Sequence, residues 1–313
     1  MKLFGKDRIK ARLDDMAAKQ RLPHAILLHG PKGAGKKTLA RYLAQLFMCS
    51  DSACGACTAC RLIETDEHPD VVFVKRSRDG KYSMDGLRAV IADSVIMPNN
   101  GGLKVYVFED CDDMLVQQQN ALLKLIEEPA AYLRFIFTCE NENALLETIL
   151  SRVMEFEVQM PSAEECAQCL IESECDSEKA AELAQMFSGN IGKCRAVLDG
   201  GEETALISTA KKAADAVARM DKLSFAAALT EQSGRAEYSE TLGYLTEILR
   251  DALSIRCGGE AFSCGKDEAK RIAAAFSEEF ILSMLDAVFE VSANAKYNLN
   301  LALTTSYLTS RLY

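Results

Sequence analysis

The chain has 313 residues, 49% hydrophobic and 26% charged, a composition typical of a globular protein with two or three domains. Its formal net charge is -10 and its pI is about 5.0, which argues against independent nucleic-acid binding, because such proteins usually carry a basic face. The sequence has no long apolar run and no signal-peptide core near its start, so we expect a cytoplasmic protein without a membrane partner, whose 12 cysteines are thiols or metal ligands.

The first predicted elements surround a glycine-rich turn. Arg8 to Lys19 has apolar side chains at helical spacing and ends before Pro23, which predicts an amphipathic helix. A strand is predicted to begin near Ala25, and a helix over Leu39 to Phe47 follows the turn. Strand, glycine-rich turn and helix in this order are the context that a phosphate-binding P-loop requires.

The turn itself reads Gly30-Pro31-Lys32-Gly33-Ala34-Gly35-Lys36-Lys37-Thr38. Its three glycines (Gly30, Gly33, Gly35) would let backbone amides face a phosphate, and Lys36 would reach the outer phosphates. The pattern asks for Ser or Thr directly after Lys36, because that hydroxyl binds Mg²⁺. Lys37 occupies this place, and Thr38 comes one residue late, about 100° further round the helix. The turn therefore predicts a nucleotide-binding fold whose catalytic chemistry is damaged.

Short apolar strands alternate with helices up to about Gln159. The further predicted strands are Val71–Val74, Lys104–Phe108, Arg134–Thr138 and Met154–Val158, and the further predicted helices are Leu87–Val95, capped by Ser83 or Asp85, and Gln117–Ile126. This alternation predicts an α/β fold with a parallel sheet covered on both faces. Beyond Pro161 the pattern is helical, with a break near Gly200 and Gly201 and a loop near Cys257 to Gly265. We therefore predict domains over residues 1–160, 161–201 and 202–313.

An acidic pair, Glu109 and Asp110, follows the strand that ends at Phe108. In active nucleotide enzymes an acidic residue at such a strand end holds magnesium and a water. The usual order is Asp then Glu, and here it is reversed. The alternative is a pair of ordinary strand-end carboxylates, but the P-loop upstream favours a descended nucleotide site that is no longer active.

Four cysteines, Cys49, Cys54, Cys57 and Cys60, have the spacing C-x4-C-x2-C-x2-C. Close thiolate pairs suit a tetrahedral Zn²⁺ with all four positions filled, which is a structural site rather than a catalytic one. The alternative is four buried thiols. Cys166 and Cys169 have a similar spacing on a helical pattern, and we interpret them as packing residues.

The remaining polar signals are weak. His24, His29 and His68 show no spacing typical of a metal site or a catalytic triad. The basic run Lys75 to Arg78 is interpreted as a solvated turn, with DNA contact as the alternative.

Several motifs together resemble those of the bacterial clamp-loader AAA+ family, over nearly the whole chain. Besides the P-loop and the four cysteines, the matching segments are Leu22–Ala25, His68–Asp70, Lys104–Asp110, Asn120–Lys124, Glu127–Pro129, Ile149–Arg152 and Asn298–Leu303. The resemblance implies a RecA-like AAA+ domain with a zinc module over residues 49–60, a small helical lid and an all-helical collar that oligomerises. It also implies gamma/tau and delta subunits, the sliding clamp and primed DNA as partners.

Within the family, the chain resembles the delta-prime branch, whose members act as stators, more than the gamma/tau ATPases. It departs from the ATPases at Lys37, at the reversed acidic pair and at Gly192, which stands where the lid's sensor 2 arginine is expected. Thr138 matches the sensor 1 position, and its alternative is a simple strand-end residue.

Arg152, in Ser151-Arg152-Val153, matches the arginine that reaches the ATP of a neighbouring subunit. Its alternative is a surface arginine that caps a helix.

The resemblance therefore implies a subunit that is not an enzyme on its own and completes a clamp-loading complex of DNA polymerase III. The candidate nucleotide-site residues are Gly30, Gly33, Gly35, Lys36, Lys37, Thr38, Glu109, Asp110 and Thr138. Whether ATP or ADP binds without hydrolysis is left open. The alternatives are an active gamma/tau-like ATPase and a zinc-dependent DNA-binding module.

Overall fold

The computed structural model describes residues 3–74, 76, 81–99, 102–231, 234–294 and 300–312. Its contacts form two compact units, Met1–Cys166 and Ala167–Tyr313. The predicted boundary near residue 160 lies close to this division. The separate lid over residues 161–201 stays a prediction.

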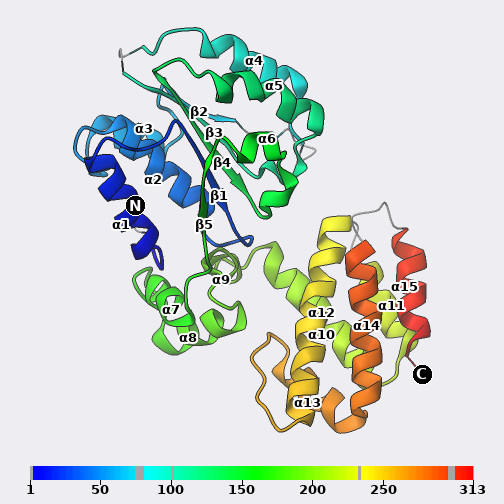
Figure 1. The fold of residues 1–313 in the computed structure, drawn as a ribbon. Coiled ribbons are helices and arrows are strands. Elements are labelled where there is room, and N and C mark those ends of the chain that lie inside the picture. Colours follow the sequence, from blue (N-terminus) through cyan, green and yellow to red (C-terminus); the bar gives the residue numbers. More distant parts are fainter. Residues whose placement is uncertain are drawn as a thin grey trace. The chain divides into compact units, whose positions relative to one another are not determined.

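A five-stranded parallel sheet forms the centre of the first unit (Figure 1). The strands are β1 (Ala25–His29), β2 (Val71–Val74), β3 (Lys104–Phe108), β4 (Leu133–Cys139) and β5 (Met154–Glu157), in the order β2-β3-β4-β1-β5. All five predicted strands are confirmed, with ends that differ by one residue at most. The strands β1 to β4 are mainly apolar on both faces, as strands buried between two helical layers must be, whereas the edge strand β5 alternates and exposes Glu155 and Glu157.

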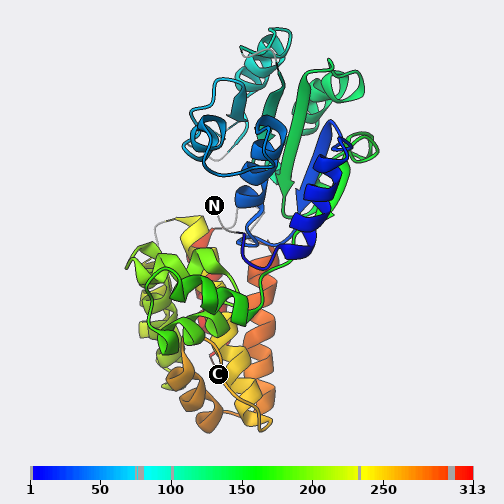
Figure 2. The ribbon, with the colours of Figure 1, turned by 90° about the vertical axis from the view of Figure 1, so that its left-hand side faces the viewer.

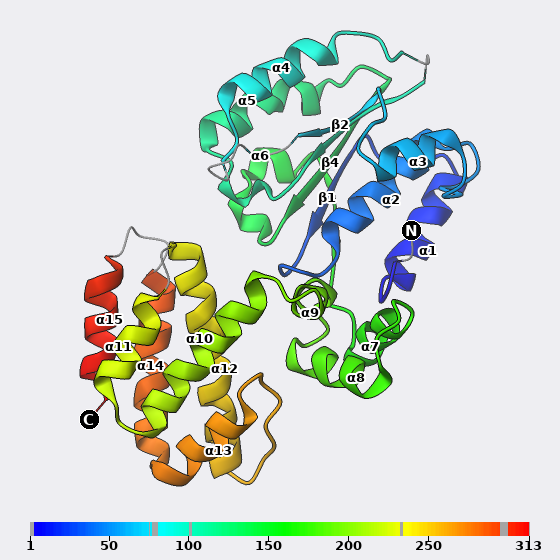
Figure 3. The same ribbon diagram turned by 180° about the vertical axis from the view of Figure 1, so that it is seen from behind.

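Helices cover both faces of the sheet (Figure 3). The helices of this unit are α1 (Asp7–Ala18), α2 (Lys36–Met48), α3 (Thr58–Glu64), α4 (Met84–Ser94), α5 (Val116–Glu127) and the short α6 (Glu147–Leu150). One core holds Leu13 of α1 and Leu43 of α2 against Ile26 and Leu28. The opposite core holds helices α4, α5 and α6 against Leu27 and the stacked rings of Phe108 and Phe137. The α/β fold class is thereby confirmed.

Local capping explains where two helices begin. Ser83 is the N-cap of α4, as one of the two predicted alternatives had it, and its side chain accepts a hydrogen bond from the Gly86 amide. The helix α3 was not predicted. It begins after Cys57, whose sulfur accepts a hydrogen bond from the Cys60 amide. Two short 3₁₀ turns, η1 (Cys111–Asp113) and η2 (Glu142–Ala144), follow β3 and β4.

The second unit is helical throughout its described residues, as predicted. After α7 (Ala163–Ile171), which runs across the division, it contains α8 (Ser177–Met186), α9 (Ile191–Leu198), α10 (Glu202–Ala218), α11 (Lys222–Thr230), α12 (Arg235–Arg256), α13 (Lys266–Ala275), α14 (Glu278–Asn294) and α15 (Leu301–Ser310). The orange helix α14 runs along most of this unit beside α12 (Figure 2). The predicted loop lies between α12 and α13.

The segment that resembles the family's collar helix is only partly described. Residues 298 and 299 lie outside the described residues, whereas Asn300 caps α15 by accepting hydrogen bonds from the Ala302 and Leu303 amides. Among the helices of the described ranges, none combines the length and apolar content that crossing a bilayer requires.

Candidate functional site

The glycine-rich turn links β1 to α2 in a conformation that depends on its glycines. Gly33 and Gly35 have positive φ angles of 87° and 86°, and Gly35 is the left-handed N-cap of α2. The Lys36 side chain is buried, and its Nζ donates hydrogen bonds to the carbonyls of Gly30 at 2.6 Å and Pro31 at 3.0 Å. Burial lowers the pKa of Lys36, an effect that the nearby acidic groups oppose. The structure therefore has the backbone and the lysine of a P-loop.

Gly30, at the start of this loop, packs closely against Val158, the residue that follows β5. Its φ is +147°, and a Cβ at this position would lie 2.2 Å from the Val158 carbonyl oxygen. We therefore expect Gly30→Ala to reduce the free energy of unfolding of the first unit by at least about 2 kcal/mol in urea titrations. Gly102→Ala is the control, because a Cβ there would meet nothing within 4 Å. Equal stability of the two variants would contradict this account of Gly30.

Lys37 lies against the acidic pair. Its Nζ is 2.8 Å from Asp110 Oδ2 and 3.2 Å from Glu109 Oε2. Burial acts against the charge on Lys37, but the two carboxylates outweigh it and raise the Lys37 pKa. Thr38 is half-buried one residue further along α2. The residue that stands in place of the Mg²⁺-binding hydroxyl thus brings an ammonium group to the carboxylates.

Two arginines add further positive charge to the acidic pair. Arg76 pairs with Asp110 Oδ2 at 2.7 Å and with Asp113 at 2.7 Å, and Arg41 lies 3.8 Å from Glu109. Burial opposes ionisation of Asp110, but Lys37 and Arg76 hold its pKa below the usual range. Arg76, interpreted from the sequence as part of a solvated turn, is thus partly exposed and paired with two carboxylates. Its neighbours in that basic run, residues 75, 77 and 78, lie outside the described residues.

Thr138 holds the backbone of the acidic pair. Its buried hydroxyl accepts a hydrogen bond of 2.8 Å from the Asp110 amide. Asp110 itself has a left-handed backbone with a φ of 55°, so this bond fixes a conformation that non-glycine residues rarely adopt. Strand β4 thereby supports the acidic pair at the end of β3.

The four predicted zinc ligands lie together in the α2–α3 connection. Their sulfur atoms are all within 4.8 Å of one another, and Cys49 Sγ is 3.7 Å from the sulfurs of both Cys54 and Cys57. A tetrahedral zinc with Zn–S bonds of 2.3 Å would place its sulfurs about 3.8 Å apart. The cluster therefore has the dimensions of a structural metal site.

The thiols of the cluster differ in pKa. Burial opposes ionisation of Cys49, but hydrogen bonds from the amides of Cys54 and Asp51 prevail and lower its pKa to about 7. Burial raises the pKa of Cys60 to about 12, helped by the neighbouring thiols. A metal ion would compensate the charge that ionising all four thiols creates. Cys166 and Cys169 are buried, as predicted for packing residues.

Arg152 follows α6 at the entry to the edge strand β5. Its guanidinium pairs with Glu127 at 2.9 Å and donates to the Thr148 carbonyl at 2.7 Å and to Ser151 Oγ at 2.9 Å. Its side chain remains 37% exposed. The residue is thus held on the surface by the ends of α5 and α6.

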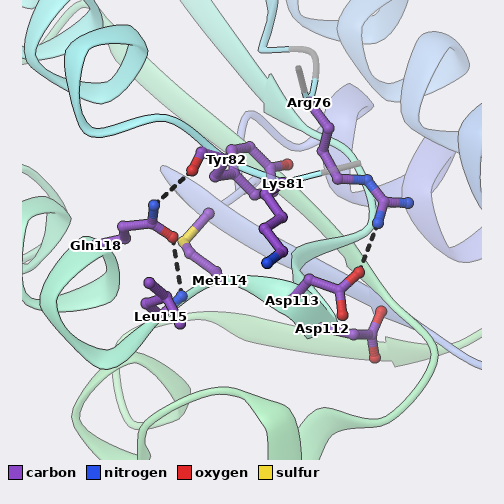
Figure 4. A pocket seen from close by; sticks show the side chains of 8 residues that line it. All are labelled: Arg76, Lys81, Tyr82, Asp112, Asp113, Met114, Leu115 and Gln118. Carbon is purple, nitrogen blue, oxygen red and sulfur yellow. Dashed lines mark hydrogen bonds and ion pairs between the residues drawn. The ribbon is translucent and has the colours of Figure 1, made fainter. Parts of the chain in front are cut away.

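A pocket of about 570 Å³ opens beside Arg76 (Figure 4). Its lining combines cationic, acidic and apolar side chains: Arg76, Lys81, Tyr82, Asp112, Asp113, Met114, Leu115 and Gln118. Gln118 closes one wall by donating to the Tyr82 carbonyl and accepting from the Leu115 amide. None of the described P-loop residues lines this pocket, so it is distinct from the phosphate site.

Sequence reasoning missed a second group of side chains of the types that ligate metals. The Nδ1 atom of His29 lies 2.9 Å from a carboxylate oxygen of Glu142, and Glu155 completes the group. No spacing in the chain could have identified it, because the three residues come from distant segments.

Comparison with known proteins identifies the family. The profile of the family described as "DNA polymerase III, delta subunit" matches residues 5–162, just over half of the chain. The chain belongs to this delta-subunit family. The clamp-loader resemblance that the sequence motifs indicated is thereby confirmed.

Known proteins that are similar in sequence match this chain to different extents. The chain is 27% identical to DNA polymerase III subunit delta' of Bacillus subtilis, over 94% of this chain and 92% of the relative. It is 32% identical to the delta' subunit of Pseudomonas aeruginosa, over 53% of each chain. Subunit tau of Escherichia coli is 28% identical over 52% of this chain and 26% of the relative.

A solved structure of a DNA polymerase III gamma subunit-related protein from Thermotoga maritima has the same fold. The TM-score is 0.51 at 18% identity, with 95% of this chain and 97% of that chain covered. At this identity the likeness shows the fold alone. It agrees with a parallel α/β unit followed by helices.

Proposed function

We propose that this chain is a delta'-type subunit of the DNA polymerase III clamp loader. It would assemble with gamma/tau and delta subunits in the cytoplasm and help to load the sliding clamp on primed DNA. The family match and the delta' relative that covers 94% of the chain support this assignment. In this role the chain does not hydrolyse ATP by itself.

The contact between Lys37 and the acidic pair is the observation that carries the proposal. A catalytic P-loop keeps its acidic strand end available to Mg²⁺ and water. Here Lys37 and Arg76 both lie within 3 Å of Asp110. Their positive charges repel a divalent cation from this place. The site is therefore degenerate on its magnesium side, although the loop amides and Lys36 still offer contacts to the phosphates of ATP or ADP.

The lid segment gives independent support within the second unit. Gly192, where the family places an arginine, is the second residue of α9 and has no side chain to offer a phosphate. The adjacent Lys193 is engaged elsewhere, 3.0 Å from the Tyr244 hydroxyl and 3.6 Å from Glu203. A cation that senses nucleotide is thus missing from the position that the resemblance assigns to it.

We expect the isolated protein to show negligible ATP hydrolysis. Loss of one preorganised charge contact costs on the order of a hundredfold in rate, and this site has lost more than one. The measurement is steady-state phosphate release at saturating Mg·ATP, with the gamma/tau subunit of the same organism as the reference. Turnover close to that reference and abolished by Lys36→Ala would establish the active-ATPase alternative instead.

The zinc-dependent DNA-binding alternative has its own test. If that alternative held, the full chain would bind a primed duplex by itself at physiological salt and would lose this binding when the metal is removed. We expect no such binding, because the formal charge of -10 opposes a polyanion.

We further propose that Arg152 acts as an arginine finger on a neighbouring subunit. Its side chain is partly exposed and lies at the entry to the edge strand of the sheet. An arginine at a surface can contact the transferred phosphoryl group of another chain, where its planar fork grips two oxygens.

A further inference from the structure

Three metal-ligating side chains meet at the carboxyl end of β1, apart from both the acidic pair and the four cysteines. His29 is the last residue of β1, Glu142 begins η2, and Glu155 lies on β5. One ligand atom from each lies within 4.8 Å of the other two. Imidazole nitrogen and carboxylate oxygen are both common ligands of divalent transition metals.

The backbone holds two of these side chains firmly. Leu27 is the register partner of Glu155, and His29 lies two residues further along β1, so His29 and Glu155 project from the same face of the sheet. The Val158 amide donates to the His29 carbonyl at 2.7 Å, which fastens the end of β1 to the chain leaving β5.

The third side chain comes from a capped turn. The Asn141 side chain accepts a hydrogen bond from the Asn143 amide and so fixes the start of η2. Glu142 then reaches His29 Nδ1 at 2.9 Å. Three ligands placed by separate pieces of backbone give a preorganised site, because no long loop must be ordered when an ion binds.

The charges of the group favour a bound cation. Glu142 and Glu155 together carry two negative charges, and a protonated His29 would balance only one of them. The three ligand atoms, which lie close together, therefore have a net negative charge around them. Water can also reach the site, because the side chain of His29 is 18% exposed and that of Glu142 is 40% exposed. Solvent provides both an entry path and the remaining ligands.

We propose that His29, Glu142 and Glu155 bind one divalent first-row transition-metal ion, with water completing its coordination. One nitrogen and two carboxylate oxygens suit Mn²⁺ and Zn²⁺. The ion would connect β1, η2 and β5 directly before Gly30, and so would brace the base of the P-loop. This inference does not depend on the proposed clamp-loader function.

Mn²⁺ is the probe that separates this site from the four cysteines, because manganese prefers oxygen and nitrogen ligands to thiolates. The full chain, purified with zinc retained, is titrated with MnCl₂ without nucleotide. Free Mn²⁺ is followed by its electron paramagnetic resonance signal. We expect one ion per chain, and an affinity that falls about tenfold or more in both His29→Gln and Glu155→Gln.

Glu157→Gln is the matched control. It makes the same change of charge on the same strand and the same face, as the register partner of His29, at an exposed carboxylate that is not part of the cluster. We expect its Mn²⁺ affinity to equal that of the unaltered protein. Circular dichroism and the melting temperature show whether each variant folds. If His29→Gln or Glu155→Gln does not fold, Glu142→Gln takes its place as the ligand variant.

Several outcomes would overturn the proposal. Absence of saturable Mn²⁺ binding would leave only the ion pair between His29 and Glu142. An equal loss in Glu155→Gln and Glu157→Gln would mean diffuse attraction to an acidic edge. Binding that survives His29→Gln, or that Mg²⁺ displaces at equal concentration, would exclude the imidazole as a ligand.

Discussion

Replacing Arg152 by alanine should slow ATP hydrolysis by the assembled clamp loader while leaving the subunit folded. Charge builds on the phosphoryl oxygens in the transition state, and an arginine supplied from a neighbour contributes roughly 10³–10⁵ in rate at a single site. A complex with several ATP sites would show a smaller overall loss. Folding should be little affected, because the ion pair between Arg152 and Glu127 is exposed and such pairs add little stability.

The measurement is ATPase and clamp-loading rate in complexes reconstituted with gamma/tau, delta, clamp and primed DNA. Arg152→Lys tests the geometry, because lysine keeps the charge and loses the planar fork, so it should rescue little. Arg88→Ala is the control, since Arg88 is an exposed arginine paired only locally with Asp85. Wild-type rates with Arg152→Ala would leave this residue as a charge at the end of α6.

The second large effect is expected at the four cysteines, where we propose a structural zinc. Cys57→Ser should abolish stoichiometric zinc binding and loosen residues 49–64. Structural zinc in small zinc-finger peptides contributes about 10–16 kcal/mol of apparent binding free energy at neutral pH, so loss of one thiolate ligand weakens the site severely. Cys57 also caps α3, and serine keeps this cap because its hydroxyl accepts the same hydrogen bond, so any loosening would report the lost metal ligand.

Elemental analysis of protein purified without chelator gives the metal content, and hydrogen exchange locates the loosened segment. Cys257→Ser is the control, because Cys257 is exposed in the loop between α12 and α13. Exchange in α12 and α14 should be the same in both variants. Substoichiometric zinc in the unaltered protein, or unchanged exchange over residues 49–64 in Cys57→Ser, would count against a structural zinc.

The strands could be predicted because β1 to β4 are nearly continuous apolar runs and β5 alternates apolar and acidic residues, signals contained within four to seven residues. The P-loop and the cysteine cluster were found for a similar reason, since their residues are close in sequence. The helix α3 was missed because its seven residues are too few for helical periodicity and its cap is a cysteine sulfur.

The parts of the site that sequence reasoning missed depend on contacts between distant residues. Arg76 meets Asp110 across 34 positions, and Glu127 meets Arg152 across 25. His29 and Glu155 become neighbours only because β5 pairs with β1 at the sheet edge. Spacing along one chain carries no information about such pairs, whereas strand order and register create them.

The ammonium of Lys37 differs from a magnesium ion because it is always present, whereas the ion binds and dissociates. A metal ion arrives with nucleotide and leaves with it, so a site that uses one changes during every turnover. Lys37 is covalently part of the chain, and its raised pKa keeps it charged until the pH rises through that value, above the usual 10.5. The positive charge beside Asp110 therefore cannot dissociate from the protein, and neither chelators nor the supply of nucleotide can change it. Next to subunits that cycle, a subunit with this site would have the same local charge at every stage.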